Sequence, residues 1–357
     1  MAVWLAQWLG PLLLVSLWGL LAPASLLRRL GEHIQQFQES SAQGLGLSLG
    51  PGAAALPKVG WLEQLLDPFN VSDRRSFLQR YWVNDQHWVG QDGPIFLHLG
   101  GEGILGPGSV MRGHPAALAP AWGALVISLE HRFYGLSIPA GGLEMAQLRF
   151  LSSRLALADV VSARLALSRL FNISSSSPWI CFGGSYAGSL AAWARLKFPH
   201  LIFASVASSA PVRAVLDFSE YNDVVSRSLM STAIGGSLEI VLHSLGQKCL
   251  SFSRAETVAQ LRSTEPQLSG VGDRQWLYQT CTEFGFWDTD PWHVLSVTQA
   301  LGSSESTLLI RTGSHCLDMA PERPSDSPSL RLGRQNIFQQ LQTWLKLAKE
   351  SQIKGEV

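Results

Sequence analysis

The sequence predicts an α/β protein with a mostly parallel sheet and helices on both of its faces. Two apolar runs, residues 94–99 and 124–129, each end in glycine or polar residues. Runs that are apolar throughout are typical of parallel strands buried on both faces. Residues 155–171 have a helical pattern and lead through four serines into a third apolar run at 179–182. Strand, helix and strand in this order form the β-α-β unit of a parallel sheet.

The remaining elements follow in chain order. Residues 203–207 form a further strand, and residues 212–287 have mostly helical patterning, which indicates an inserted cap. Residues 307–310 are expected to resume the sheet, and residues 334–348 to form a closing amphipathic helix. We therefore predict a signal peptide at 1–24, a leader or linker at 25–57, a first core part at 58–211, a truncated helical cap at 212–287 and a second core part at 288–357.

Composition excludes several classes of partner. With 357 residues, 46% of them hydrophobic and 15% charged, the chain is long and apolar enough to bury a large core. The 27 basic residues equal the 27 acidic ones, so no net charge attracts nucleic acid. We predict no nucleic-acid partner, no cofactor and no metal ion, and the sequence leaves the oligomeric state open.

The first residues resemble a secretory signal. Residues 5–21 carry no charged side chain and precede Ala22-Pro23-Ala24, the small-x-small pattern of signal cleavage. The alternative is an uncleaved anchor, because no lysine or arginine precedes Arg28. The apolar core is short for a spanning helix of ~20 residues. We expect cleavage near Ala24, with no stable membrane anchor afterwards.

Sequons and cysteines agree with secretion. Asn70 and Asn172 each begin an Asn-x-Ser tripeptide, which predicts glycosylation at both. The chain has 4 cysteines, and an oxidising compartment permits one or two disulfides. Cys249 and Cys281 lie in one segment and form the expected pair, whereas Cys181 lies in a predicted buried strand and can simply belong to the core.

Ser185 is the candidate nucleophile. It stands between an apolar strand and a helix, flanked by Gly183, Gly184, Ala187 and Gly188. Such a small-residue turn is the sequence form of a nucleophile elbow, which lifts a serine hydroxyl clear of a sheet. The usual pattern has glycine at the position of Ala187. A plain packing turn or a phosphate-binding turn is the alternative interpretation.

A serine nucleophile requires a histidine base and a carboxylate that orients it. In α/β-hydrolases the chain order is serine, acid, histidine, each on a loop after a strand. His315 has the last place, with His131 and His293 as rivals. Asp290 has the middle place, although an Asp-Thr-Asp-Pro sequence is more often a helix cap or a turn, and Asp288 is its alternative.

The oxyanion hole is expected from two backbone N–H groups. One belongs to Tyr186, the residue after the nucleophile, and the other to Gly101 in the glycine loop after the strand at 94–99. The alternative for Gly101 is a simple turn.

Several motifs in one order resemble the lysosomal Pro-X carboxypeptidase and dipeptidyl peptidase II family of serine peptidases. The resemblance extends from about Pro57 to the C-terminal helix. The motifs are Gly93-Pro94-Ile95-Phe96, Gly100-Gly101-Glu102-Gly103, Glu130-His131-Arg132-Phe133-Tyr134-Gly135, Ala156-Leu157-Ala158-Asp159, Gly183-Gly184-Ser185-Tyr186-Ala187-Gly188, Asp290-Pro291-Trp292 and His315-Cys316-x-Asp318.

This resemblance implies an α/β-hydrolase core interrupted by a helical cap between serine and acid. It implies the triad of Ser185, Asp290 and His315, action on peptide or protein substrates, often near proline, and residence in endosomes and lysosomes. A member that the chain resembles is associated with processing peptides for presentation to developing T cells, and that role too comes from the resemblance alone.

The chain departs from the family pattern before the acid. Family members usually have a larger cap and a strand ending in Asn-Gly that leads to the acid loop. Here residues 279–286 lead directly into residues 287–290. The chain resembles a shortened or alternatively spliced form. Loss of a strand of ~5 residues from the middle of a sheet exposes its neighbours' edges unless another segment, such as 283–287, replaces it.

Three functions remain open from the sequence. The first is an active serine peptidase, whose exo- or endopeptidase action the shortened cap leaves undecided. The second is a secreted variant with impaired catalysis that acts as a binding or regulatory protein. The third is an esterase, which the extent of the peptidase motifs disfavours.

Overall fold

A six-stranded mixed sheet is the centre of the molecule. The computed structural model describes residues 57–213, 258–259, 261–265, 272–284, 306–308, 310 and 316–354. The strands lie in the order β1 (Lys58–Leu65), β2 (Ser76–Asn84), β4 (Leu125–Leu129), β3 (Ile95–Leu99), β5 (Trp179–Gly184) and β6 (Ala204–Ser208). The four strands β4, β3, β5 and β6 run parallel, whereas β1 and β2 form an antiparallel pair and β2 is antiparallel to β4. The predicted mostly parallel sheet is confirmed.

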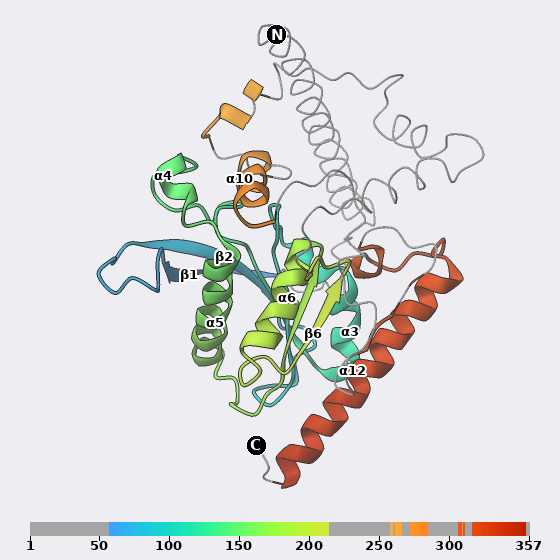
Figure 1. Ribbon diagram of the computed structural model, residues 1–357. Helices are drawn as coiled ribbons and strands as arrows, with labels where there is room; N and C mark the ends of the chain where they lie inside the picture. Colours follow the sequence, from blue (N-terminus) through green and yellow to red (C-terminus); the bar gives the residue numbers. More distant parts are fainter. Residues whose placement is uncertain are drawn as a thin grey trace, which may run out of the picture.

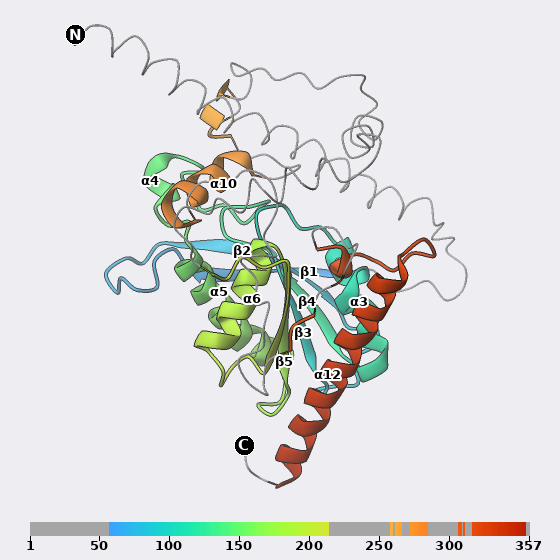
Figure 2. The same ribbon diagram turned by 45° about the vertical axis from the view of Figure 1, so that its right-hand side comes forward.

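Helices cover both faces of this sheet. On one face lie α5 (Ser153–Leu170) and α6 (Tyr186–Lys197), and on the other lie α3 (His114–Trp122) and α12 (Pro328–Lys354) (Figure 1). The turned view shows the strands between α6 and α12 (Figure 2). The shorter elements are α2 (Gly108–Met111), α4 (Met145–Leu148), α10 (Asp273–Gln279), a π-helix (Thr280–Phe284) and a 3₁₀ turn (Leu317–Met319).

Strand alternation explains the two covered faces. Successive side chains of a strand point to opposite faces, so a strand covered on both faces is apolar throughout. Ile95 and Leu97 of β3 pack with the α5 and α6 side, while Phe96 packs with Leu341 of α12. All five residues of β4 are buried. The core therefore consists of two apolar layers separated by the sheet.

Among the described residues, the sheet contains one hairpin that was not predicted and lacks one strand that was. The hairpin of β1 and β2 has no predicted counterpart, because β1 is mostly exposed and lacks a continuous apolar run. Residues 307, 308 and 310 are not in a strand, although a strand was predicted there. In the described part of the chain β6 pairs with β5 alone. Residues 307, 308 and 310 do not occupy the other edge of β6, because a short apolar run indicates burial and does not by itself specify a strand.

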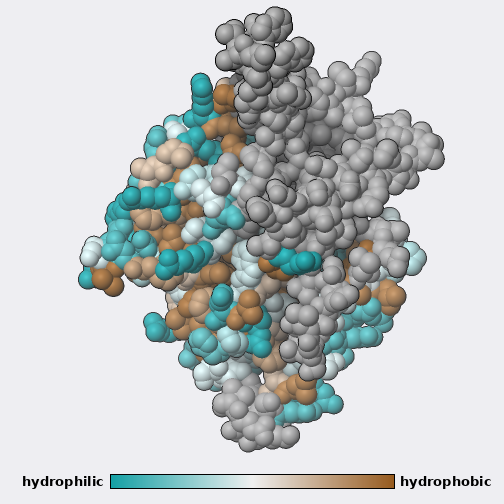
Figure 3. Space-filling view, in the orientation of Figure 1, coloured by the Kyte–Doolittle hydropathy of each residue, from teal (hydrophilic) through white to brown (hydrophobic). Residues whose placement is uncertain are grey.

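Several predicted features lie outside the described residues. They are the signal peptide, the leader, Cys249, Asp288, Asp290, His293 and His315. Among the described helices, none is both long and apolar enough to span a bilayer. The described part of the face in Figure 3 intersperses hydrophilic and hydrophobic residues.

Candidate active site

Ser185 occupies a sharp turn between β5 and α6. Its backbone has φ of 58° and ψ of −132°, a conformation that residues other than glycine rarely adopt. The turn is held by the Ser185 N–H, which donates to the Ser208 carbonyl at 2.9 Å. The Ser185 carbonyl accepts from the Ser189 N–H at 3.1 Å, which starts α6. Strained backbone held by its surroundings is a recurrent feature of functional sites.

Small residues are required around this turn. A Cβ added to Gly183 would lie 2.2 Å from the carbonyl oxygen of Ala187, and one added to Gly188 would lie 2.9 Å from the Cβ of Ala210. Backbone atoms cannot move aside as a flexible side chain can, so larger residues would force the strand and helix apart.

The glycine loop after β3 contacts the start of α6. A Cβ added to Gly101 would lie 3.2 Å from the Cβ of Ala187 and 3.1 Å from its backbone nitrogen. Ala187, which departs from the usual glycine, therefore fits because its methyl group faces a residue without a side chain. The two segments expected to supply the oxyanion donors are in contact.

Tyr186 places a phenol beneath the turn in a polar pocket of the core. The side chain is 1% exposed. Its hydroxyl lies 3.0 Å from Nε2 of His131, 3.0 Å from Nε2 of Gln279 and 3.2 Å from Oγ of Ser153. Burial raises the pKa of this phenol well above its ordinary value.

His131 is a structural residue rather than a rival base for Ser185. Its Nδ1 lies 2.7 Å from the Arg132 carbonyl, and its Nε2 contacts Tyr186. Since a carbonyl can only accept, Nδ1 carries the proton and Nε2 is the acceptor. Burial lowers the pKa of His131 to about 3, so the ring is neutral at physiological pH.

The charged residues beside His131 form two buried ion pairs. Arg132 donates to both carboxylate oxygens of Asp159, each at 2.7 Å, and its guanidinium is fully buried. Glu130 pairs with Arg80 at 2.7 Å and accepts from the Ser137 hydroxyl at 2.8 Å. These two motifs therefore hold the loop after β4 to β2 and α5, and this support was not predicted from the sequence.

The segment that follows His315 lies beside the elbow. The Cys316 N–H donates to the Ser209 hydroxyl at 3.1 Å, and the Asp318 carboxylate accepts a short hydrogen bond from the Ser208 hydroxyl. A Cβ added to Gly184 would lie 2.9 Å from the Cys316 sulfur. Gly184 adjoins Ser185, so the chain neighbour of His315 packs directly against the nucleophile turn.

Arg334 holds this segment from α12. Its guanidinium donates to the carbonyls of Leu317, Asp318 and Ala320 at 2.9, 3.0 and 3.0 Å. It also pairs with Asp326 at 2.5 Å, and the residue is 4% exposed. Arg334 was not predicted as a functional residue from the sequence. The available signal was a charge at the start of the apolar stripe that continues through Phe338 and Leu341.

The structure describes both predicted glycosylation sites but not the predicted disulfide. Asn70 and Asn172 are both exposed, as a glycan acceptor requires. Cys181 and Cys316 are free cysteines, and Cys181 is buried in β5. Cys249 and the Cys281 side chain lie outside the described residues, so the expected disulfide stays a prediction.

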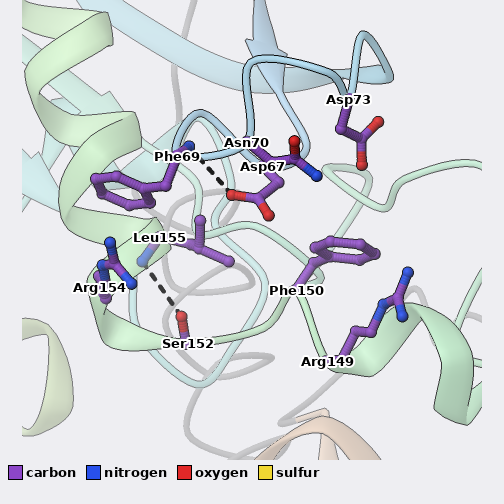
Figure 4. A pocket seen from close by; sticks show the side chains of 9 residues that line it. All are labelled: Asp67, Phe69, Asn70, Asp73, Arg149, Phe150, Ser152, Arg154 and Leu155. Carbon is purple, nitrogen blue, oxygen red and sulfur yellow. Dashed lines mark hydrogen bonds between the residues drawn. The ribbon is translucent and has the colours of Figure 1, made fainter.

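A surface pocket of about 470 Å³ adjoins Asn70 (Figure 4). Two arginines on its wall stack on phenylalanines, Arg154 at 3.8 Å from the Phe69 ring and Arg149 at 4.7 Å from the Phe150 ring. Asp67 accepts from the Phe69 N–H within the same loop. The charged side chains Arg149, Arg154 and Asp67 therefore contact other residues of the pocket wall.

Comparisons with known proteins follow this geometry. The family model described as "Serine carboxypeptidase S28" matches residues 64–240, 234–289 and 287–337. The human protein named thymus-specific serine protease is 69% identical over 514 residues, covering 100% of this chain and 100% of the relative. The mouse protein of that name is 55% identical, covering 97% and 99%. Mouse lysosomal Pro-X carboxypeptidase is 37% identical, covering 45% of this chain and 34% of its own. Among solved structures an arylesterase matches at 16% identity with a TM-score of 0.30, covering 53% of this chain and 55% of its own.

The alignments with the relatives contain positions that this chain lacks. The human relative aligns over 514 positions, whereas this chain has 357 residues, so more than a quarter of the positions have no residue of this chain opposite them. The family model matches in three pieces that meet near residues 234–240 and 287–289. The second junction falls immediately before Asp290, where the sequence analysis found the expected strand absent.

Proposed function

We propose, from the premise that this chain belongs to the serine carboxypeptidase S28 family, that it hydrolyses peptide bonds with Ser185 as the nucleophile. The observation that carries the proposal is the strained backbone of Ser185 at a strand-to-helix turn. An ordinary helix start does not require a positive φ at a serine, whereas a nucleophile elbow does.

His315 is the proposed general base and Asp290 the residue that orients it. The position of Cys316 against Gly184 supports His315, because adjacent Cα atoms are only about 3.8 Å apart. Asp290 is supported by its place in the chain order and by the family motif. Its alternative, Asp288, stands two positions earlier in the sequence.

The proposed reaction proceeds through an acyl-enzyme. Ser185 Oγ attacks the scissile carbonyl while His315 removes its proton, and the tetrahedral oxyanion is stabilised by the N–H groups of Tyr186 and Gly101. His315 then protonates the leaving amine, and water repeats the sequence to release the acid. Contact between Gly101 and Ala187 supports this pair of donors.

The finer proposals come from the relatives. We propose cleavage near proline, residence in the secretory pathway and then in endosomes or lysosomes, and a thymic role in processing peptides for antigen presentation. The names of the Pro-X carboxypeptidase and thymus-specific relatives support the proline, lysosomal and thymic parts of this proposal, and the role in antigen presentation comes from the family resemblance alone. Glycans at Asn70 and Asn172 would accompany this route.

A second candidate is a variant with impaired catalysis that acts through binding. The specific observation is β6, which pairs on one side within the described residues and has Ala207 exposed and Val206 half-buried. A strand in mid-sheet normally has partners on both sides. The break in the family match at residues 287–289, just before Asp290, supports this candidate.

A fluorophosphonate probe decides between the candidates. An active triad predicts covalent labelling of the wild-type chain at Ser185, loss of labelling in Ser185→Ala, and a fall of up to about 10⁴-fold in turnover for Asp290→Asn. A relative with the complete cap serves as the positive control. If that relative is labelled and this chain is not, the binding variant is favoured. Cleavage of a proline-containing peptide against a simple acyl ester separates peptidase from esterase action.

A further inference from the structure

A chain of buried hydrogen bonds joins the cap to the nucleophile turn. The Tyr134 hydroxyl donates to Oε1 of Gln279 at 2.6 Å, and Nε2 of Gln279 donates to the Tyr186 hydroxyl at 3.0 Å. Gln279 is 0% exposed and is the last residue of α10. It therefore links Tyr134, in the loop after β4, to Tyr186, the residue next to Ser185.

Donors and acceptors can be assigned along this chain from His131 to Tyr134. Nδ1 of His131 donates to a carbonyl, so Nε2 accepts and the Tyr186 hydroxyl gives it its only proton. The oxygen of Tyr186 then accepts from Nε2 of Gln279 at 3.0 Å, and the Ser153 hydroxyl lies 3.2 Å from the same oxygen. Burial raises the pKa of both Tyr134 and Tyr186, which keeps both phenols protonated. At position 279 the chain requires a side chain that accepts at one end and donates at the other.

We propose that Gln279 is a positioning residue that holds the backbone N–H of Tyr186 in the geometry of the oxyanion hole. This inference rests on the proposed function, in which that N–H stabilises the tetrahedral oxyanion. Tyr186 is the first residue of α6, so its ring and its backbone donor belong to one residue at the turn. A catalytic donor must be held within about 0.5 Å of its productive position.

Two further contacts fix the direction from which Gln279 approaches. The Trp276 ring, also on α10, packs on the Tyr186 ring with centroids 5.7 Å apart. The π-helix that follows Gln279 brings Glu283 to the start of α5, where its carboxylate accepts from the Ser153 N–H at 2.8 Å and from the Ser153 hydroxyl at 3.0 Å. π-Helical turns are frequent at functional sites.

Gln279→Glu in the full chain tests this role. The variant keeps the shape of the side chain, but an ionised carboxylate cannot donate to Tyr186. At about pH 8 we expect kcat to fall about tenfold with KM within about twofold, which is less than the 10²–10³-fold lost when an oxyanion donor is removed. A protonated carboxyl can donate, and burial favours that form. The ratio of variant to wild-type kcat should therefore rise as pH is lowered toward about 5.

Gln275→Glu is the matched control. Gln275 lies on the same helix, is 4% exposed and donates to the Phe133 carbonyl at 2.9 Å. Its amide holds the cap to the core through the Phe133 carbonyl, whereas that of Gln279 donates to Tyr186. A general loosening of the cap would affect both variants, whereas a positioning role predicts that the kcat ratio of Gln275→Glu stays flat with pH. A flat ratio for Gln279→Glu, or the same rise in both, would overturn the proposal.

A second measurement does not depend on catalysis. Backbone amide hydrogen exchange at residues 185–189 should be at least about threefold faster in Gln279→Glu than in wild type at neutral pH, and unchanged in Gln275→Glu. If the wild-type chain fails to react with the fluorophosphonate but exchange rises, the proposed function fails and the positioning role stands. If the chain is labelled and exchange is unchanged, this inference alone fails.

Tyr186→Phe completes the cycle. The variant removes the hydroxyl but keeps the ring and the backbone N–H, so adding Gln279→Glu to it should cause no further loss of kcat. Fully additive losses would show that Gln279 acts through another contact. Far-UV circular dichroism on each variant confirms that the fold is retained.

Discussion

The two regions that meet at the nucleophile turn are organised differently. Residues 57–213 contain all six strands of the sheet. The turn at Ser185 is shaped by residues of its own strand and helix, such as Gly183 and Ala187. Residues 316–354 form a 3₁₀ turn and one long helix, which contact that turn through distant side chains such as Arg334. The nucleophile region therefore depends on local sequence, and the C-terminal region depends on tertiary contacts.

This difference explains why missing internal sequence affects the two regions unequally. The family model matches residues 64–240 in one piece, which includes the entire nucleophile region. It breaks at 287–289, just before the proposed acid. The candidate nucleophile keeps its complete local environment, whereas the path that leads to the acid and histidine is altered.

Gly183→Ala tests the local character of the nucleophile region and has the largest expected effect. The new methyl group would lie 2.2 Å from the Ala187 carbonyl, so we expect a loss of at least about 3 kcal/mol in the free energy of unfolding and loss of probe labelling. Urea denaturation measures the stability. Ala187→Gly, which only removes a methyl group in the first turn of α6, should cost about 1 kcal/mol or less. Equal effects of the two variants would contradict the steric argument.

Arg334→Met tests the tertiary character of the C-terminal region. The variant leaves Asp326 and three carbonyls without their buried partner, so we expect the free energy of unfolding to fall by about 3 kcal/mol. We also expect kcat to fall, because the segment after His315 loses its support. Denaturation and kcat are measured on the same protein. Arg331→Met is the control, because Arg331 lies on the same helix, is exposed and donates to one carbonyl, that of Pro324. An unchanged kcat in Arg334→Met would show that the contacts of Arg334 stabilise the fold but do not position the active site.

Acid pH should weaken both regions through buried histidines. Burial lowers the pKa of His131 to about 3 and that of His114, which lies near Arg334, to about 4. Both values lie below the pKa of about 6.5 in the unfolded chain, so the unfolded state binds more protons as pH falls. Their stabilising contribution is present above pH 6.5 and is lost as pH falls toward these folded-state values. From about pH 6.5 to about pH 5.5 each should cost about 1 kcal/mol.

His114→Leu isolates the contribution of the C-terminal side. The variant should flatten the pH dependence of the free energy of unfolding by about 1 kcal/mol over that interval. Thermal or urea melts at several pH values measure it. A slope identical to that of wild type would mean that protonation of His114 does not contribute to the pH dependence of stability across this range.

Ser185→Gly has the smallest expected effect and concerns backbone strain. Glycine adopts a φ of 58° without steric cost, so Ser185→Gly should be more stable than Ser185→Ala by about 1 kcal/mol. Both variants lack the nucleophile, so the difference in their melting reports the turn alone. Alanine as the more stable replacement would show that the turn relaxes when the hydroxyl is removed.

The sequence by itself determined much of the sheet and the turn at Ser185. Apolar runs predicted β3, β4 and β5 to within a residue or two, and the small residues around Ser185 predicted a sharp turn. These signals are local, because strand burial and turn geometry depend on neighbouring residues. The strand predicted at 307–310 failed in its described residues, because a short apolar run indicates burial and does not by itself specify a strand.

Only the tertiary structure decided which polar groups support the site. The bond from Tyr134 to Gln279 joins positions 145 residues apart, and the bond from Ser208 to Asp318 joins positions 110 residues apart. The tertiary structure also showed that His131 is a neutral structural residue, whereas the sequence left it as a possible base. Periodicity records burial along one element but carries no information about a partner on another. The pairing of buried donors and acceptors is settled only when the elements pack together.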